Sequence, residues 1–422
     1  MKVLFLVHRF FPCGDAATKC VAGLLAPLQA QGITADVLCI TPYPSVFASD
    51  SGICKGQVFR SWSPGCADRE EFQSLLKSSL PAAAICLLQK LFFWTMRRFI
   101  AVFRQSGMDW GLYHTFRINL KKILRTHRYD AVIATVCCVE CAWAVYTLHP
   151  KAPWYLYQLD PYSENKETSP VCHTARRCIE QILYQNAAAV FTTGPIYQQK
   201  QASHFPFCER CNVLEFPLIQ PQFAQSEPKH SKDSIICAFT GTLYPEIRPP
   251  EEFVRLVAKL KMPNIVFCCA GSGQHLITEA PDYPAAAPYL RCLGRVPTET
   301  ADALMNAADF LINIDNRVSN QVPSKIFEYF STGKPVINLH FGNLCPSETY
   351  IQRYPLALNI DCMKDASENA LLLERFLSHS LGQRVPPDII QSHFAECTPV
   401  YVAQKMAAIL LNPKSTVIPT RI

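Results

Sequence analysis

The sequence contains no long uninterrupted apolar segment. Its apolar stretches are broken by charged or amide residues before they reach the roughly 18 residues that a membrane-spanning helix needs. The opening MKVLFLVHRF has an apolar run that is too short for the core of a signal peptide. We therefore predict neither a spanning helix nor a secretory leader, and we expect a cytoplasmic protein.

Charged residues are also few, at 18% of the chain against 49% hydrophobic residues. This balance is typical of folded domains and excludes a largely disordered chain. The net charge of +6 is mildly basic, but the Lys/Arg runs with interleaved aromatic residues that mark nucleic-acid-binding proteins are missing. We expect an anionic substrate or membrane surface as partner, and no nucleic acid.

The dinucleotide-binding fingerprint G-x-G-x-x-G is absent after the first predicted strand, where the chain has HRFFPCGDAAT. In nicotinamide-dependent oxidoreductases those glycines let the backbone approach the pyrophosphate. Their absence argues against that class of enzyme.

Cysteine, in contrast, is abundant, with 20 residues. In a chain without a leader we expect reduced thiols rather than disulfides. Two C-x-x-C pairs, Cys138 with Cys141 and Cys208 with Cys211, offer four zinc ligands on paper, but their separation is far beyond zinc-ribbon spacing. Ordinary buried cysteines are the favoured interpretation.

Two series of alternating strand and helix patterns divide the chain. The first begins with KVLFLVHRFFP, AATKCVAGLLAPLQAQG and ITADVLCITPYP, which predict a buried strand, a helix and a second strand. After a polar, proline-containing stretch, SIICAFTGTLY, PPEEFVRLVAKLK and NIVFCCAGSG repeat this order. The length of 422 residues also suits two cores rather than one.

We therefore predict an α/β protein with two Rossmann-like β/α/β domains facing a central cleft. The N-terminal domain covers 1–216, a linker covers 217–234, the second domain covers 235–395, and a C-terminal segment covers 396–422. Because ligands of open parallel sheets bind beyond the carboxyl ends of the strands, we expect the loops after these strands to line the cleft.

A basic, aromatic segment interrupts the first domain. LPAAAICLLQKLFFWTMRRFIAVFRQ, followed by FRINLKKILRTHR, mixes apolar, aromatic and basic residues at helical spacing. This composition is typical of a helix that lies on an anionic membrane. A core helix with its basic face in water is the alternative, and the sequence leaves both open.

The stretch QVPSKIFEYFSTGKPVI, residues 321–337, predicts a helix with an unexpected carboxylate. Ser324 is a candidate N-cap, whereas Glu328 lies one residue beyond the capping-box position. Helical spacing places Ser324, Glu328 and Ser331 on one face. The helix start with Lys325 suits a diphosphate and Glu328 suits vicinal hydroxyls, which together indicate a nucleotide sugar. A solvated helix face is the alternative for Glu328.

This stretch resembles the C-terminal signature of retaining GT-B glycosyltransferases similar to glycosyltransferase family 4, in which P-S-K-hydrophobic-hydrophobic-E-Y precedes G-K-P-V-I. Further segments follow the family's order: HRFFP with GDAAT, then FTGTLYPEIRPPEEFVRLV, then CAGSGQ with LGRVPTETADALMNAADFLINI. The terminal CTPVYVAQKMAAILL is similar to the helix that crosses back to the first domain. The resemblance implies the GT-B fold and a retaining, hexosyltransferase-type sugar transfer from a nucleoside-diphosphate sugar to an acceptor hydroxyl.

The resemblance also implies catalytic roles in the second domain. Glu328 matches the carboxylate that holds the donor ribose. Arg248 matches the basic residue at the donor diphosphate, with an ordinary surface charge pair with Glu246 as the alternative. Lys325 and Ser324 complete the expected diphosphate contacts. Because these groups would stabilise the departing diphosphate, and because the sequence lacks the D-x-D motif of the other major glycosyltransferase fold, we expect no metal and no cofactor beyond the nucleotide-sugar substrate.

Two glycine loops and two departures from the family pattern complete the expected donor site, one at Asn320 and one at Phe253, which replaces a frequent family lysine. Gly241 and Thr242 match the loop near the phosphates, and Gly271 and Gly273 match the loop near the base. Asn320 stands where the family often has a second glutamate, eight residues before Glu328. An amide still hydrogen-bonds a sugar hydroxyl but offers no charge.

On the acceptor side, the resemblance points to the first domain. Gly14 with Asp15 lies at the tip of the first strand-to-helix loop, and Asp160 with Tyr162 follows a buried strand. Asp160 is the candidate acceptor-side catalytic group, with a simple turn as the alternative. The expected acceptor is a saccharide or a lipid-linked saccharide at the inner membrane face, as in bacterial surface-polysaccharide assembly.

Two other functions remain open. Asn320 in place of the first glutamate motivates a catalytically inactive GT-B scaffold that binds a nucleotide or a partner. A nucleotide-sugar epimerase shares the same fold and the same kind of donor.

Overall fold

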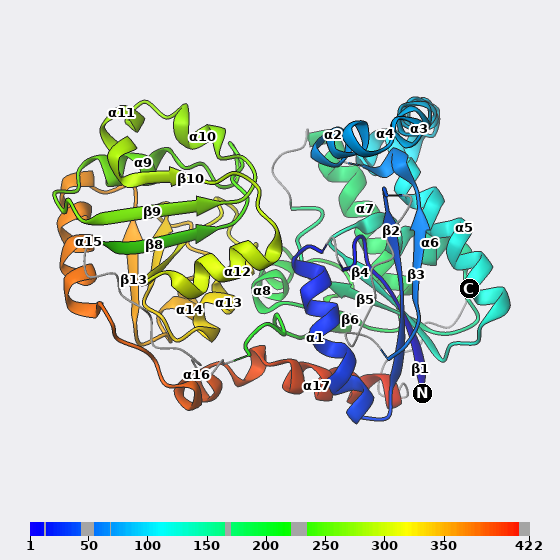
Figure 1. The fold of residues 1–422 in the computed structure, drawn as a ribbon. Coiled ribbons are helices and arrows are strands. Elements are labelled where there is room, and N and C mark those ends of the chain that lie inside the picture. The colour runs from blue at the N-terminus through cyan, green and yellow to red at the C-terminus, as the bar shows by residue number, and fades with distance from the viewer. Residues whose placement is uncertain (12–13, 44–54, 68, 165–169, 221–233, 413–422) are drawn as a thin grey trace. The chain divides into compact units, whose positions relative to one another are not determined.

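The chain forms two compact units in a computed structural model (Figure 1). Unit 1 consists of Met1–Pro217 together with Pro399–Ile422, and unit 2 of Leu218–Thr398. The structure describes residues 1–11, 14–43, 55–67, 69–164, 170–220 and 234–412. Most of the predicted linker, residues 221–233, lies outside the described residues.

Unit 1 is built on a seven-stranded sheet with the strand order β3-β2-β1-β4-β5-β6-β7. All its strand pairs are parallel. The strands are β1 (Lys2–Leu6), β2 (Thr34–Thr41), β3 (Val58–Trp62), β4 (Ala131–Val136), β5 (Trp154–Gln158), β6 (Val190–Thr192) and β7 (Cys211–Val213). The helices are α1 (Ala16–Ala30), α2 (Arg69–Ser78), α3 (Leu80–Phe99), α4 (Ala101–Ser106), α5 (Trp110–Thr126), α6 (Val139–Leu148), α7 (Pro170–Asn186), α8 (Gly194–Ala202) and α17 (Pro399–Leu411).

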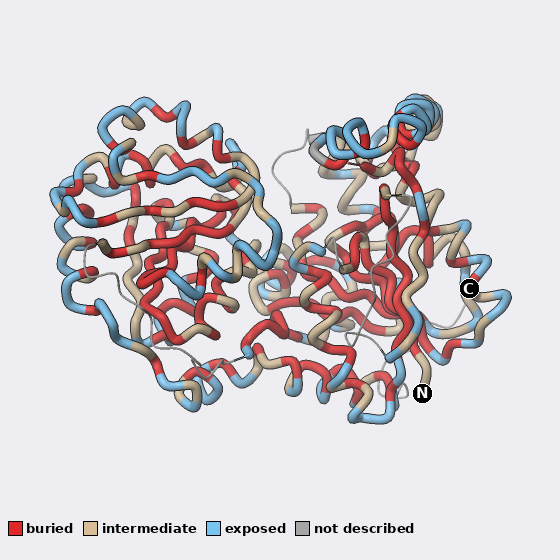
Figure 2. The backbone as a smooth tube through the Cα atoms, viewed as in Figure 1, coloured by how far each residue is buried: buried red, intermediate tan, exposed pale blue. Residues whose placement is uncertain are grey.

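The central strands of unit 1 are buried along nearly their whole length. Every residue of β4 and β5 is buried, as are the last four residues of β1. Figure 2 shows this burial as red segments along the strands of each sheet. Continuous apolar runs, rather than alternating ones, are what a parallel sheet inside an α/β protein requires.

The last helix of the chain belongs to unit 1. α17 packs against α1, and both helices turn apolar side chains into this contact region and the core. On α17 the buried residues include Val402, Met406 and Leu410. The predicted return of the terminal helix to the first domain is therefore confirmed.

Unit 2 holds a six-stranded sheet with the order β10-β9-β8-β11-β12-β13, again with parallel pairs. The strands are β8 (Ile235–Thr240), β9 (Ile265–Ala270), β10 (Leu290–Cys292), β11 (Phe310–Ile314), β12 (Val336–His340) and β13 (Ala357–Asp361). The helices are α9 (Glu251–Ala258), α10 (His275–Thr278), α11 (Tyr283–Ala286), α12 (Thr298–Ala307), α13 (Lys325–Ser331), α14 (Glu348–Ile351), α15 (Ala366–Ser380) and α16 (Pro387–His393).

The predicted architecture of two Rossmann-like β/α/β halves is confirmed by these two sheets. The first strand of each half sits near the middle of its sheet, and the next strand in sequence pairs beside it. No helix within the described ranges combines the length and the apolar character needed to cross a bilayer.

Candidate functional site

Two glycine loops lie against each other at the carboxyl edge of the unit 2 sheet. Gly271 follows β9 with a φ of +135°, and a Cβ there would lie 1.9 Å from the carbonyl oxygen of Gly241 after β8. Gly273 has a φ of +80°, and its Cβ would lie 2.3 Å from the oxygen of Leu243. Only glycine permits this backbone approach. The structure therefore brings the predicted donor loops together.

Arg248 is held over the first of these loops. Its Nη1 donates to the carbonyl of Thr242 at 3.2 Å, and its Nε donates to Oδ1 of Asn316 at 3.1 Å. Desolvation lowers the pKa of the guanidinium, while the nearby Asp315 carboxylate opposes this shift. Within the described part of the chain, Nη2 has no hydrogen-bond partner, so one edge of the fork remains for a ligand.

Two buried residues at the end of β11 support Arg248. Asn316 accepts its hydrogen bond and donates Nδ2 to the carbonyl of Gln321 at 2.8 Å, just before α13. Asp315 is fully buried and accepts from Oγ of Ser347 at 2.7 Å, and burial raises its pKa. Sequence reasoning missed both residues, although a polar pair directly after the buried strand FLINI was the available signal.

Glu328 and Lys325 form an ion pair on α13. Nζ of Lys325 lies 2.9 Å from Oε2 of Glu328, and the two side chains are 26% and 17% exposed. The predicted polar groups are thus at the surface but partnered with each other. Such an i, i+3 pair is weak, so a ligand that offers phosphate to the lysine and hydroxyls to the glutamate can replace it.

The start of α13 differs from the prediction. Ser324 stands at the N-cap position, but its backbone is already helical and its side chain makes no capping hydrogen bond. The helix has seven residues, so the alignment of its peptide dipoles is short. The positive charge at this edge therefore comes from Arg248 and Lys325 rather than from the helix start.

Ser331 does not share the polar face of Glu328, so that prediction is wrong. Its hydroxyl is buried, donates to the carbonyl of Phe327 at 2.9 Å and accepts from the amide of Gln220 at 3.0 Å. A hydroxyl that bonds back to its own helix can be buried without an unpaired group, which the helical spacing alone does not show. Ser331 fastens the chain that enters unit 2.

Tyr329, the next residue after Glu328, joins α13 to β8. Its hydroxyl bonds to the amide, the carbonyl and Oγ1 of Thr240 at 3.0, 3.2 and 3.1 Å. Burial, more than any other cause, raises its pKa to about 12, and Glu328 and Arg248 are close enough to shift that pKa in opposite directions. Tyr329 therefore holds Glu328 near the loop that carries Arg248, a role that sequence reasoning missed.

Asn320 lies deeper than the prediction implies. Its side chain is 4% exposed, and its Nδ2 is buried without a hydrogen-bond partner in the described residues. A sugar hydroxyl reaches this amide only if the surrounding chain opens.

In unit 1, Asp15 and Gly14 have structural partners. Oδ1 of Asp15 accepts from the amide of Thr18 at 2.8 Å, and Oγ1 of Thr18 accepts from the amide of Asp15 at 3.1 Å. This is a capping box at the start of α1. A Cβ on Gly14 would lie 2.8 Å from Cγ2 of Thr18, so the glycine makes room for that cap.

Asp160 nevertheless shares a sheet edge with Asp15. Burial raises the pKa of the Cys137 thiol at the end of β4, and the Asp15 and Asp160 carboxylates raise it further, so both carboxylates lie within electrostatic range of this cysteine. His8, at the end of β1, donates its backbone amide to the same thiol. The ends of β1, β4 and β5 thus present a small polar group of side chains.

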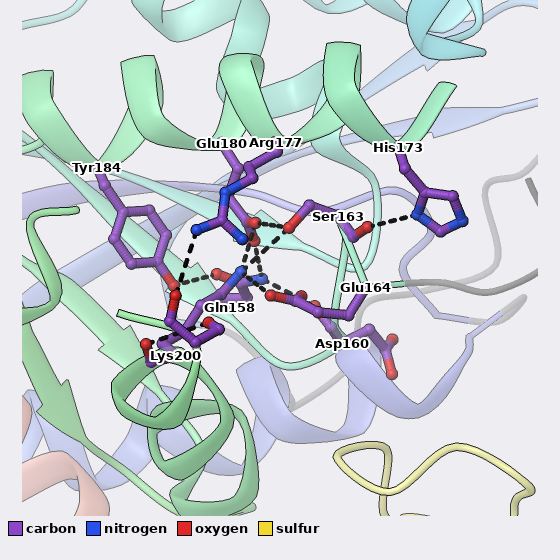
Figure 3. A network of polar contacts seen from close by, with 10 residues as sticks. Gln158, Asp160, Ser163, Glu164, His173, Arg177, Glu180, Tyr184 and Lys200 are labelled. Atoms are coloured by element: carbon purple, nitrogen blue, oxygen red, sulfur yellow. Dashed lines mark hydrogen bonds and ion pairs between the residues drawn. The ribbon is translucent and has the colours of Figure 1, made fainter. Parts of the chain in front are cut away.

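The loop that carries Asp160 rests on a buried polar network (Figure 3). Nε2 of Gln158 donates to the carbonyl of Asp160 at 3.2 Å and to Oε1 of Glu180 at 2.7 Å. The hydroxyl of Tyr184 donates to Oε1 of Gln158 at 2.7 Å. Glu180 and Tyr184 both come from α7, so that helix supports the loop.

Lys200 of α8 is the centre of this network. Its fully buried Nζ pairs with Oε1 of Glu164 at 2.6 Å, with Glu180, and with Oγ of Ser163 at 3.3 Å. The centroid of the Phe205 ring lies 4.0 Å from the Lys200 ammonium, in a cation–π contact. One lysine therefore connects the loop after β5 to two helices. No pattern in the sequence around Lys200 predicts this role. Tyr162, in the same loop, lies under the guanidinium of Arg176 at 5.3 Å.

The C-x-x-C pairs lie among ordinary protein contacts. The thiol of Cys138 lies 3.2 Å from Glu140, and the thiol of Cys141 donates to the carbonyl of Thr135 at 3.2 Å. Burial raises the pKa of Cys208 and Cys211, which keeps these thiols protonated. In the portion of the chain with described coordinates, no group of three or more His, Cys, Asp or Glu residues could hold a metal ion.

Comparison with known proteins gives structural matches alone, since no family model and no curated protein matches the chain. Sucrose-phosphate synthase from Thermosynechococcus elongatus matches with a TM-score of 0.66 and 14% identity, over 98% of this chain and 99% of that one. WaaG, a glycosyltransferase involved in lipopolysaccharide biosynthesis, matches with a TM-score of 0.61 and 14% identity, over 97% and 99%. A third structure, described as trehalose-6-phosphate from E. coli bound with UDP-2-fluoro glucose, matches with a TM-score of 0.62 and 11% identity, over 97% of this chain and 99% of that one. At such identities the likeness identifies the fold, and the chain has the GT-B fold that these proteins share.

Proposed function

We propose that the protein transfers a sugar from a nucleoside-diphosphate sugar to an acceptor hydroxyl, with retention of anomeric configuration. The observation that carries this proposal is the grouping of Arg248 with Glu328 and Lys325 at one sheet edge, where Tyr329 lies close to both sides. Two cations and a carboxylate over glycine loops suit a diphosphate and its ribose.

In the proposed reaction, the bound donor replaces the ion pair between Lys325 and Glu328. The diphosphate accepts hydrogen bonds from Lys325 and from the unoccupied edge of Arg248, while Glu328 accepts from the ribose hydroxyls. As the bond to the sugar breaks, negative charge grows on the leaving diphosphate and positive charge on the sugar ring. Preorganised cations lower the energy of that state more than the energy of the bound donor. This chemistry needs no metal.

For the acceptor, we propose a saccharide or lipid-linked saccharide that contacts Asp160 and Tyr162, with Gly14 and Asp15 beside them. Several matched proteins support this direction. WaaB is a lipopolysaccharide outer core galactosyltransferase, WaaG is involved in lipopolysaccharide biosynthesis, and TarM has been solved with UDP. We place the protein in the cytoplasm, peripheral to the inner membrane face, in surface-polysaccharide assembly.

The buried Asn320 favours a second candidate, a GT-B scaffold that binds a nucleotide or partner without turnover. An epimerase acting on a nucleotide sugar would use the same donor groups, and product analysis separates it from a transferase.

The first test is a thermal-shift titration with UDP, GDP, ADP and dTDP in the presence of EDTA. A nucleotide that binds only the folded protein raises its melting temperature. We expect one of the four to stabilise the wild type but not Glu328→Ala, and turnover of the matching donor to fall at least tenfold in that variant, or about 1.4 kcal/mol of transition-state stabilisation.

Glu252→Ala is the matched control for this test. Glu252 pairs with Arg255 at 2.7 Å on α9, also three residues apart, and its side chain is 15% exposed. We expect this variant to keep the nucleotide response. Near-wild-type kinetics in Glu328→Ala would contradict the role of that residue, and no response to any nucleotide in the wild type would favour the inactive scaffold.

A further inference from the structure

α3 carries most of its large apolar side chains on the side that faces away from the core of unit 1. Seven of them are between 52% and 81% exposed: Leu80, Leu87, Leu88, Leu91, Phe92, Trp94 and Phe99. Figure 2 shows much of this helix, labelled in Figure 1, as exposed. Contiguous apolar surface of this kind usually marks a contact with a membrane or another molecule.

The inner face of α3 is only part of the helix surface. Its buried residues are the small Ala82, Ala83 and Cys86, and Phe93 and Met96 pack partly buried against the core of unit 1. Gln89 and Lys90 fix the helix further, because Gln89 accepts from the amide of Gly65 at 2.8 Å and Lys90 donates to the carbonyl of Ala67 at 2.7 Å. A helix that served only the core would not carry seven more large apolar side chains on its outer side. The outer face is therefore built for an apolar phase.

The charge around this face is almost entirely positive. Residues 80–128 contain nine Lys and Arg residues and one acidic residue, Asp109. Asp109 accepts from the amide of Leu112 at 2.9 Å and caps α5. The exposed basic residues of α3, α4 and α5 are Arg97, Arg98, Arg104, Lys121, Lys122 and Arg125. The guanidinium of Arg98 lies 4.7 Å from the ring of Trp94, so an aromatic residue and a cation share one surface position.

The exposed apolar side chains and the positive charge around them together indicate which partner binds this face of α3. Apolar and aromatic side chains suit the boundary between headgroups and acyl chains, and a cationic rim suits anionic lipid headgroups. A second copy of the chain would bring its own cationic rim, and α3, α4 and α5 contain no acidic residue to pair with it. Charge complementarity therefore favours lipid over self-association.

We propose that the outer face of α3 docks the protein on an anionic membrane surface. The helix lies in the interface, with Leu88, Leu91 and Trp94 below the headgroups and Arg97 and Arg98 at the lipid phosphates. This inference deepens the proposed function, on which it rests for the acceptor, because it brings the enzyme to the surface where lipid-linked saccharides are found.

Flotation with lipid vesicles tests the proposal on the full chain. We expect the wild type to float with vesicles that contain phosphatidylglycerol at low salt, and far less with pure phosphatidylcholine or at high salt. The triple variant Leu88→Ser/Leu91→Ser/Trp94→Ser should lose at least tenfold in vesicle affinity. Arg97→Gln/Arg98→Gln should lose about thirtyfold on anionic vesicles only, since each of the two basic residues near the surface contributes about 1 kcal/mol.

Leu371→Ser/Leu372→Ser is the matched control. Both leucines are exposed, at 50% and 43%, on α15 of unit 2. This variant should float like the wild type. A wild type that stays in solution at low salt, or a triple variant that floats like the wild type, overturns the proposal. A dimer that the triple variant converts to a monomer, without vesicle binding, shows instead that a second copy covers the face.

The nucleotide titration separates this proposal from the donor site. The α3 variants should keep the wild-type response to nucleotide, because α3 lies in unit 1 and the donor groups lie in unit 2. If no nucleotide binds the wild type, the proposed function fails, but flotation still decides whether α3 binds lipid.

Discussion

At the residue scale, the side chains that the sequence predicts to bind a ligand differ in how many of their polar atoms already bond to other protein groups. Asp15 caps α1, and Glu328 is paired with Lys325. Arg248 has two of its nitrogens fixed and Nη2 without a partner in the described residues. A ligand at the proposed donor site would therefore replace one weak ion pair, whereas a ligand that binds Asp15 would have to replace a helix cap.

His8 provides a prediction at the same scale. Burial, followed by the charge of Arg9, lowers its pKa from 6.5 to about 3. The native state keeps this imidazole neutral while the unfolded chain protonates it, so the unfolded state binds more protons between about pH 3 and 6.5. The free energy of unfolding should fall as the pH drops through this window, by up to about 1.4 kcal/mol per pH unit.

Urea denaturation of the wild type and His8→Gln measures this contribution. Between pH 6.5 and 4.5, the variant should lose less unfolding free energy than the wild type, and above pH 7.5 the two curves should run parallel. Equal losses in both proteins at acid pH would show that His8 is not the group responsible.

At the element scale, later helices fix the loops that follow the strands. Tyr329 of α13 holds the end of β8, and Lys200 of α8 holds the loop after β5. Removing the Lys200 ammonium leaves the buried Glu180 and the partly buried Glu164 without their partner. Such a loss typically lowers the free energy of unfolding by about 3–5 kcal/mol. We expect Lys200→Met to speed hydrogen exchange of the amides in residues 159–164 at least tenfold, measured by mass spectrometry.

The double variant Lys200→Met/Glu180→Gln separates two effects of Lys200: holding the loop after β5 in place, and neutralising the buried Glu180 carboxylate. It removes one buried charge with its partner and should recover much of the melting temperature, while the loop continues to exchange quickly because Ser163 and Glu164 still lack the lysine. Lys334→Met, a buried lysine of unit 2 that donates to the carbonyl of Met305 at 2.6 Å, is the control. Recovery of loop protection in the double variant would contradict a positioning role.

The elements also show what the sequence can and cannot predict. Central strands such as β1 and β8 are continuous apolar runs, and the sequence predicts them correctly. It does not predict β3 or β13, whose residues are mostly half-buried, because an edge strand needs fewer apolar residues. For α3, periodicity predicts the helix, but only the packing shows that most of the large apolar side chains face outward.

The same limit applies to the proposed donor site and to the loop after β5. A short motif identifies Glu328 and Lys325 because they lie in one helix. Asn316, Tyr329 and Lys200 act through partners that are 68, 89 and 20 residues or more away in the chain, and no local pattern records such contacts. Long-range polar partners therefore had to come from the structure.

At the scale of the whole molecule, unit 1 is assembled from both ends of the chain. α17 supplies Val402, Met406 and Leu410 to the region around α1, and removing these side chains exposes apolar surface worth about 25 cal/mol per Å². We expect deletion of residues 399–422 to lower the melting temperature of unit 1 and to leave nucleotide binding by unit 2 intact.

Differential scanning calorimetry with and without the bound nucleotide assigns the two transitions. In the truncated protein, the transition that shifts with nucleotide should stay at its wild-type temperature while the other moves down. A truncation that lowers the nucleotide-sensitive transition instead would show that α17 stabilises unit 2.

The discontinuity of unit 1 has a consequence for biosynthesis. The ribosome makes α1 before unit 2, but makes α17 only after every residue of unit 2 has been synthesised. During the synthesis of unit 2, α1 therefore lacks its α17 neighbour. A nascent chain with an unfinished apolar surface is a natural client for a chaperone, and a translation product that ends before α17 would contain all of unit 2 and an incomplete unit 1.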